Sequence, residues 1–118
     1  MLSDLKENQN IKLVDPVGYM EFISLMKNSL FVITDSGGVQ EETTALGVRC
    51  LTLRKNTERP STIEYGTNVL VDSFEEIQEQ IKNNENRKFS NPPLWDGHAA
   101  IRIADVIAEI LYREEKND

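Results

Sequence analysis

An apolar run in this sequence is followed at once by a glycine turn. Residues 30–33 read Leu-Phe-Val-Ile, and residues 34–42 read Thr-Asp-Ser-Gly-Gly-Val-Gln-Glu-Glu. The run is typical of a buried strand, and the stretch after it predicts a tight turn and then a helix. Such a turn would place a serine hydroxyl and free backbone N–H groups at a helix N-terminus, where the helix dipole favours an anion. The stretch therefore indicates an α/β unit with a candidate anion site.

Strand and helix signals alternate along most of the chain. Alternation of this kind predicts a parallel sheet with right-handed crossovers, which is part of a doubly wound, Rossmann-like α/β fold. In such sheets ligands bind beyond the carboxyl ends of the strands, so the turn at 35–38 and the loop at 54–60 are expected at one edge. The predicted strands cover 11–14, 30–34, 49–53 and 68–71, and the predicted helices cover 2–7, 19–28, 38–46, 61–64, 74–82 and 98–112.

Composition excludes several classes of function. The chain has 118 residues, enough for one domain at most, and its net charge of −7 disfavours binding to nucleic acid or to anionic membranes. One cysteine allows no disulfide within the chain, and one histidine with one cysteine gives no zinc ligand set, so we expect no metal and no cofactor. No signal sequence and no apolar run of about 18 residues is found. The default interpretation is a soluble, cytoplasmic protein.

The turn at Ser36, Gly37 and Gly38 has two interpretations. Glycines let the backbone approach a ligand and adopt positive φ, and the N–H groups that follow them point outward. Alternatively, Asp35 or Ser36 caps its own helix and the glycines merely turn the chain. Spacing alone supports both interpretations equally, because a short Ser-Gly-Gly motif has little specificity.

Two carboxylates follow the turn on the predicted helix. Glu41 and Glu42 project about 100° apart, so only one is expected to face the site, and Glu42 lies on the same helix face as Gly38. A carboxylate that accepts two hydroxyl hydrogen bonds is suited to a ribose diol. A solvated acidic first turn, stabilised by the helix dipole, is the alternative.

The loop at 54–60 is cationic and follows a predicted strand. Arg59 offers a planar guanidinium suited to phosphate oxygens, and Arg54 and Lys55 are close by in the sequence. The alternative is a surface ion pair between Arg59 and either Glu58 or Glu64.

The other reactive residues do not predict hydrolysis or catalysis by a histidine. His98 is the single histidine and stands at the start of the last predicted helix, where capping or packing is more common than catalysis. Cys50 is expected to pack within a strand. Ser36 is not part of a G-x-S-x-G nucleophile pattern, so hydrolysis is not predicted.

Four segments in order resemble a known family. They are Thr-Asp-Ser-Gly-Gly-Val-Gln-Glu-Glu at 34–42, Leu-Arg-Lys-Asn-Thr-Glu-Arg-Pro at 53–60, Gly-Thr-Asn-Val-Leu-Val at 66–71, and Leu-Trp-Asp-Gly at 94–97. Together they are similar to the non-hydrolysing UDP-N-acetylglucosamine 2-epimerases. The resemblance implies a two-domain fold shared with GT-B glycosyltransferases. Residues 1–118 would then form a single partial domain, the latter part of the C-terminal UDP-binding domain, without the N-terminal domain.

The resemblance also implies site residues and a reaction. Ser36, Gly37 and Gly38 would contact the UDP phosphates, Arg59 the diphosphate, Glu42 the ribose hydroxyls, and Phe22 the uracil. The family interconverts UDP-GlcNAc and UDP-ManNAc by eliminating UDP and adding it back to the other face, in cell-surface polysaccharide biosynthesis.

The acid, base and histidine that carry out this chemistry in the family lie in upstream segments, and His98 does not match the family histidine. The chain is therefore expected to bind UDP or UDP-GlcNAc and to contain no catalytic residues of its own. A stand-alone nucleotide-sugar-binding or regulatory module is the alternative.

The predicted strand order leaves a gap in the sheet. In the order 3-2-1-4-5-6, residues 11–14 would form the third strand and residues 30–34 the fourth, with the two missing strands between them. We therefore expect exposed apolar surface and a tendency to self-associate through the incomplete sheet, as well as the dimerisation that the family resemblance implies.

Overall fold

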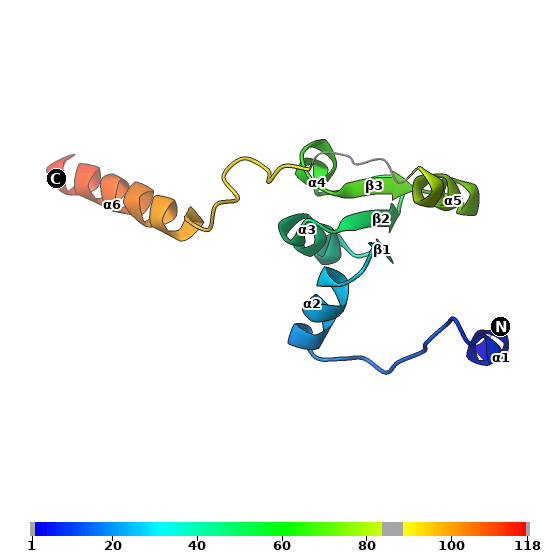
Figure 1. Ribbon diagram of the computed structural model, residues 1–118. Coiled ribbons are helices and arrows are strands. Elements are labelled where there is room, and N and C mark those ends of the chain that lie inside the picture. Colours follow the sequence, from blue (N-terminus) through cyan, green and yellow to red (C-terminus); the bar gives the residue numbers. More distant parts are fainter. Residues whose placement is uncertain (1, 84–88, 118) are drawn as a thin grey trace.

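The computed structural model describes residues 2–83 and 89–117 of the chain. Its centre is a three-stranded parallel sheet of β1 (Phe31–Thr34), β2 (Arg49–Leu53) and β3 (Asn68–Val71), in the order β1-β2-β3. Figure 1 shows the strands side by side, with helices α3 and α4 near one end of the sheet and α5 near the other. The structure confirms the predicted partial Rossmann-like α/β fold.

The register of the sheet repeats along the chain. Phe31 of β1 lies opposite Arg49 of β2, and Cys50 of β2 lies opposite Asn68 of β3. Each strand therefore pairs with residues 18 positions further on. Strands 30–34, 49–53 and 68–71 were predicted within one residue of where they occur.

Helices pack against the sheet and against one another. Helix α3 (Gly37–Leu46) contacts all three strands and α4 (Pro60–Glu64), while α2 (Tyr19–Lys27) packs against α3. The Arg49 guanidinium donates through Nη2 to the Gln80 carbonyl of α5 (Phe74–Lys82) at 2.9 Å. This arrangement places the first turn of α3 beside the end of β1.

The interior is small and unusually polar. Buried polar side chains are at least as numerous as buried apolar ones among the residues described, so hydrogen bonds contribute much of the packing specificity. The buried apolar residues are Met26, Val48, Cys50, Leu51 and Val71, and the buried polar residues are Gln40, Thr43, Thr44, Thr52, Thr62, Thr67 and Asn68.

Local signals set the helix ends as expected. Gly47 adopts φ +70° after α3, where its N–H donates to the Thr44 carbonyl and the Val48 N–H donates to the Thr43 carbonyl, a Schellman motif. Ser73 caps α5 by accepting the Glu76 N–H at 3.2 Å. Helix α4 begins at Pro60, one residue before the prediction, because proline is well suited to the first helical position.

The predicted strand at 11–14 is wrong. Residues 11–18 form neither helix nor strand, and the side chains of Ile11, Leu13 and Val14 are exposed. A strand needs a neighbour to satisfy its backbone, and the described part of the chain offers none beside this segment. Its apolar sequence therefore predicted a strand for which the described residues provide no pairing neighbour.

The two ends of the chain extend away from the sheet. Helix α1 (Leu2–Glu7) and helix α6 (Ala99–Asn117) lie at opposite sides of Figure 1. The radius of gyration is 19.7 Å, against roughly 13 Å for a compact chain of this length. No helix in the described ranges is long and apolar enough to cross a membrane.

Helix α6 differs from its prediction in two ways. It continues five residues beyond Tyr112, where strong helix formers and the Glu109–Arg113 ion pair favour it. Its apolar face, predicted at Ala100, Ile103, Ala104, Ile107 and Leu111, is exposed rather than packed. The exposed apolar surface that we expected is confirmed, and self-association stays a prediction. The large apolar side chains of α6 that are more than half exposed are Ile101, Ile103, Val106, Ile107, Ile110, Leu111 and Tyr112.

Candidate functional site

The N-terminus of α3 is left uncapped by its own serine. Ser36 is the N-cap residue, with φ −81° and ψ 130°, but its side chain makes no capping hydrogen bond. The Ser36 N–H instead donates to Thr34 Oγ1 at 3.1 Å. The capped-helix alternative for this turn is therefore not supported as far as Ser36 is concerned. The positive end of the helix dipole faces outward with an exposed hydroxyl beside it.

Gly37 and Gly38 are the first two residues of α3. The expectation that they adopt positive φ is wrong, because in the described chain only Gly47 and Gly97 among the glycines do so. A Cβ added at Gly37 would meet nothing within 4 Å, and one at Gly38 would lie 4.0 Å from Ser36 Oγ. Neither the backbone conformation nor packing among the described residues requires glycine at these two positions. Open space in front of the helix N-terminus is what a ligand that approaches the backbone needs.

Arg59 pairs with Glu41. Its Nε lies 2.9 Å from Glu41 Oε1, with both side chains less than half exposed, so the predicted alternative pairs with Glu58 or Glu64 do not form. Both glutamates of α3 stand in its second turn, and the acidic first turn that we considered is wrong because the helix begins at Gly37. Glu41 therefore faces the loop, and Glu42 projects in another direction.

Glu58 is bound by a different arginine. Arg54 donates to it twice, with Nη2 2.9 Å from Oε1 and Nη1 3.2 Å from Oε2. This hydrogen bonding lowers the pKa of Glu58, and the positive charge of Arg54 acts in the same direction. The charge of Arg54 is thus matched locally.

Gln40 brings the turn and the loop together. Its side-chain Nε2 donates to the Ser36 carbonyl at 3.3 Å, and its Oε1 accepts the Thr57 hydroxyl at 2.6 Å. Thr57 Oγ1 in turn accepts the Arg59 N–H at 3.0 Å. The turn and the 54–60 loop therefore lie together, as the strand topology predicted. Sequence reasoning missed Gln40 and Thr57; the signal was a glutamine placed where α3 faces the sheet.

Two predicted site residues lie around this centre. Phe22 is on α2 and 38% exposed, and its helix packs against α3. Glu42 is partly exposed one turn after the glycines. The structure brings their helices together, while their roles toward a nucleotide stay predictions.

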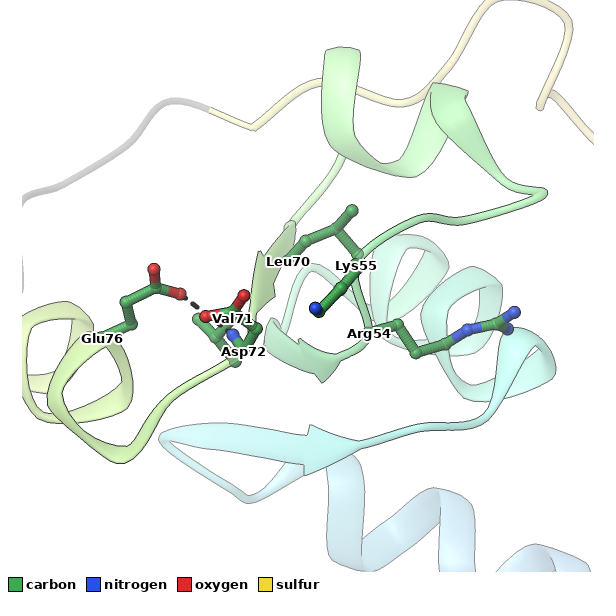
Figure 2. A pocket seen from close by; sticks show the side chains of 6 residues that line it. All are labelled: Arg54, Lys55, Leu70, Val71, Asp72 and Glu76. Atoms are coloured by element: carbon green, nitrogen blue, oxygen red, sulfur yellow. Dashed lines mark hydrogen bonds between the residues drawn. The ribbon is translucent and has the colours of Figure 1, made fainter.

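A cavity of about 340 Å³ lies beyond the ends of β2 and β3. Figure 2 shows the Lys55 amine directed into it and the Arg54 guanidinium turned away. Glu76 Oε2 accepts the Asp72 N–H at 3.0 Å on the other side. The lining has mixed charge and does not include Ser36 or Arg59, so this cavity is separate from the turn. Its lining residues are Arg54, Lys55, Leu70, Val71, Asp72 and Glu76.

His98 is exposed and stands immediately before α6. Asp96 Oδ1 accepts the His98 N–H at 3.0 Å just before the helix, and the Asp96 carboxylate pairs with Arg102 at 2.8 Å. The His98 imidazole lies 3.9 Å from Asp96 Oδ1, and its capping or packing role stays a prediction. Hydrogen bonds from Arg102, and then from the His98 N–H, lower the pKa of Asp96 to about 2.

Known proteins share this arrangement of elements. A family model described as UDP-N-acetylglucosamine 2-epimerase matches residues 1–108. A UDP-N-acetylglucosamine 2-epimerase from Methanocaldococcus jannaschii is 46% identical over 110 residues, which are 91% of this chain and 30% of that protein.

Solved structures of UDP-GlcNAc 2-epimerases match the chain as well. The M. jannaschii enzyme in complex with UDP-GlcNAc and UDP superimposes with a TM-score of 0.77 at 44% identity, covering 92% of this chain and 30% of that one. The Neisseria meningitidis enzyme bound to UDP-GlcNAc gives 0.73 at 32% identity, covering 89% and 31%. The chain thus spans about 30% of the length of the relatives it matches. Because the family match extends over most of its residues, the chain belongs to the UDP-N-acetylglucosamine 2-epimerase family.

Proposed function

We propose that the N-terminus of α3 and Arg59 bind the diphosphate of UDP, in an active site that interconverts UDP-GlcNAc and UDP-ManNAc. In this proposal Ser36, Gly37 and Gly38 contact the phosphates, Glu42 holds the ribose hydroxyls and Phe22 lines the uracil pocket. Family membership supports the proposal, and so does the M. jannaschii relative solved with UDP-GlcNAc and UDP.

The observation that carries the proposal is an open helix N-terminus with an arginine tied to it. The Ser36 side chain makes no cap, and the space in front of Gly37 is empty of protein atoms within 4 Å of an added Cβ. Glu41 Oε1 lies 2.9 Å from Arg59 Nε as an ion pair without hydrogen-bond geometry, and Arg59 Nη1 donates to the Glu58 carbonyl at 3.4 Å. The outer edge of the guanidinium therefore suits an incoming phosphate oxygen.

In the proposed reaction these residues act on the leaving group. Elimination breaks the bond between the sugar and UDP, and negative charge develops on the departing diphosphate. Fixed N–H donors and a guanidinium stabilise that charge as it forms. The groups that move protons on the sugar would come from segments outside these 118 residues, within a cytoplasmic pathway of cell-surface polysaccharide synthesis. The chain by itself is then expected to bind UDP without epimerising UDP-GlcNAc.

Calorimetric titration of the chain with UDP and with uridine tests the binding. Removal of the Arg59 side chain in Arg59→Ala should weaken UDP binding at least tenfold, because a charge-assisted phosphate contact is lost. Arg54→Ala is the matched control from the same loop, and it should change affinity about twofold at most because Glu58 already neutralises Arg54. Equal binding of UDP and uridine, or equal losses in the two variants, would contradict the proposal.

A turnover assay tests whether the chain binds UDP without containing the proton-transfer groups. The chain incubated with UDP-GlcNAc should form no UDP-ManNAc above a control without enzyme. Measurable turnover would show that these residues contain the proton-transfer groups after all.

A further inference from the structure

A cluster of buried polar side chains lies between the sheet and helices α3 and α4. Gln40, Thr52, Thr62 and Asn68 are all 0% exposed, and Thr57 closes the cluster from the loop. They come from five separate elements: α3, β2, α4, β3 and the 54–60 loop. Polar groups buried to this degree are costly unless each finds a partner.

Asn68 is the hub of the cluster. Its Oδ1 accepts the Thr52 hydroxyl at 2.5 Å, and its Nδ2 donates to Gln40 Oε1 at 3.0 Å and to Thr62 Oγ1 at 3.1 Å. Both donor hydrogens and the acceptor of the amide are therefore used. Such a network favours one arrangement of the elements, since shifting any element leaves a buried group unpaired.

The cluster reaches both parts of the proposed diphosphate site. Toward the turn, Gln40 Nε2 donates to the Ser36 carbonyl. Toward the loop, two threonines bind the backbone of Arg59: Thr57 Oγ1 accepts its N–H at 3.0 Å, and the Thr62 hydroxyl donates to its carbonyl at 2.7 Å. Gln40 takes part in both connections, because its Oε1 also accepts hydrogen bonds from the Thr57 hydroxyl and from Asn68 Nδ2.

We propose that Gln40 and Thr57 are positioning residues, which fix the distance between the α3 N-terminus and Arg59 so that both contact one diphosphate. This rests on the proposed UDP site. The Gln40 carboxamide has one orientation here, with nitrogen toward Ser36 and oxygen toward Thr57 and Asn68, so each bond holds the other in place. Neither residue touches the ligand; they act through Ser36 and Arg59.

The structure supplies a matched control for a purely structural role. Thr44 is 3% exposed, and its Oγ1 has no hydrogen-bond partner within the described residues. Thr44→Val and Thr57→Val both replace a hydroxyl by a methyl group of similar size. Only Thr57→Val removes a link between the turn and the loop.

The experiment compares these variants in the full 118-residue chain by three measurements. Amide NMR signals of Gly37 and Gly38 without ligand report coupling to the turn, calorimetry gives the UDP affinity, and thermal unfolding reports folding. Thr57→Val should shift both glycine signals and weaken UDP binding about tenfold, and Thr57→Ser should restore both. Thr44→Val should leave the signals and the affinity unchanged.

A double variant tests whether the path runs through Gln40. Gln40→Met should weaken UDP binding as Thr57→Val does, and the pair combined should lose no more than Gln40→Met alone, because both remove one connection.

The outcomes separate the two proposals. A wild-type chain that binds UDP while Thr57→Val keeps wild-type affinity and wild-type glycine signals overturns this inference and leaves the proposed function standing. A wild-type chain that does not bind UDP overturns both. Equal effects of Thr44→Val and Thr57→Val would show a structural role only, and would also overturn the inference.

Discussion

Two helices of this chain begin at a serine, and the two beginnings are built differently. At α5, Ser73 Oγ accepts the Glu76 N–H, Glu76 Oε2 accepts the Asp72 N–H, and Glu75 and Glu76 place negative charge in the first turn. At α3, Ser36 forms no side-chain cap and the first turn carries no acidic residue.

The difference separates a helix start that the chain caps itself from one that, in our proposal, binds a ligand. At α5 the chain itself supplies a side-chain oxygen for a first-turn N–H group and negative charge for the helix dipole. At α3 neither Ser36 nor the first turn supplies a capping oxygen or a negative charge. The anion that completes α3 is therefore expected to come from outside, which is the role proposed for UDP.

Making the α3 start resemble that of α5 should have the largest effect. Ser36→Asp adds a carboxylate that caps α3 and repels phosphate, so UDP affinity should fall about a hundredfold or more while the free energy of unfolding stays the same or rises. Calorimetry and urea denaturation give the two quantities. Ser73→Asp is the control and should leave UDP affinity unchanged. Wild-type UDP affinity in Ser36→Asp would contradict the proposal that the N-terminus of α3 binds the phosphates.

Filling the space in front of α3 should have the next largest effect. Gly37→Ala adds a methyl group that meets no described atom within 4 Å apart from its chain neighbours and its own helix backbone, so stability should not fall below that of the wild type. UDP affinity should fall about tenfold because the methyl group occupies the approach to the backbone. A stable variant that binds UDP normally would show that the glycine serves no ligand.

Removing the two hydroxyls should produce opposite results. Ser73→Ala loses a cap and should cost about 1 kcal/mol of unfolding free energy without altering UDP binding. Ser36→Ala loses no cap, so its stability should match wild type, while its UDP affinity falls a few-fold. Urea denaturation and calorimetry of the pair check this; equal stability losses would mean that Ser36 caps α3 in solution.

The smallest effect concerns a third helix start, that of α6. Asp96 has a folded-state pKa of about 2, below its ordinary value of 3.8, because Arg102 and the His98 N–H bind the charged form. Its stabilisation is therefore complete above about pH 3.8 and is lost as the pH falls through 2. Circular dichroism at 222 nm between pH 5 and pH 1.5 should show a small loss of helix. Asp96→Asn should remove this step, whereas Asp105→Asn should retain it.

The sequence predicted the central sheet and its helices well because their signals are local. The apolar runs that form β1, β2 and β3, Gly47 at the end of α3 and Ser73 at the start of α5 each act within a few residues. The prediction of a strand at 11–14 was wrong because strand pairing depends on a neighbour that the sequence of the segment does not reveal. The exposed face of α6 looks like a core face for the same reason.

Within the site, residue types were predictable and partners were not. The glycine turn, the acidic pair and Arg59 were found from motif chemistry, and their contacts with UDP stay predictions. That Glu41 rather than Glu42 meets Arg59 depends on the path of the 54–60 loop. The contacts of Gln40 with Thr57 and Asn68 join residues 17 and 28 positions apart, and no local pattern specifies them.

The equal spacing of the strand register has a consequence for how the chain folds. Since β1 pairs with β2 and β2 with β3 at the same separation, closing either pair costs the same chain entropy. Order of assembly is then decided by what each closure encloses, the ten residues of α3 or the five of α4. The crossover from β1 through α3 to β2 makes more contacts than the one through α4, and it is also synthesised earlier. We expect β1, α3 and β2 to form the nucleus, onto which the Arg59 loop and β3 are added.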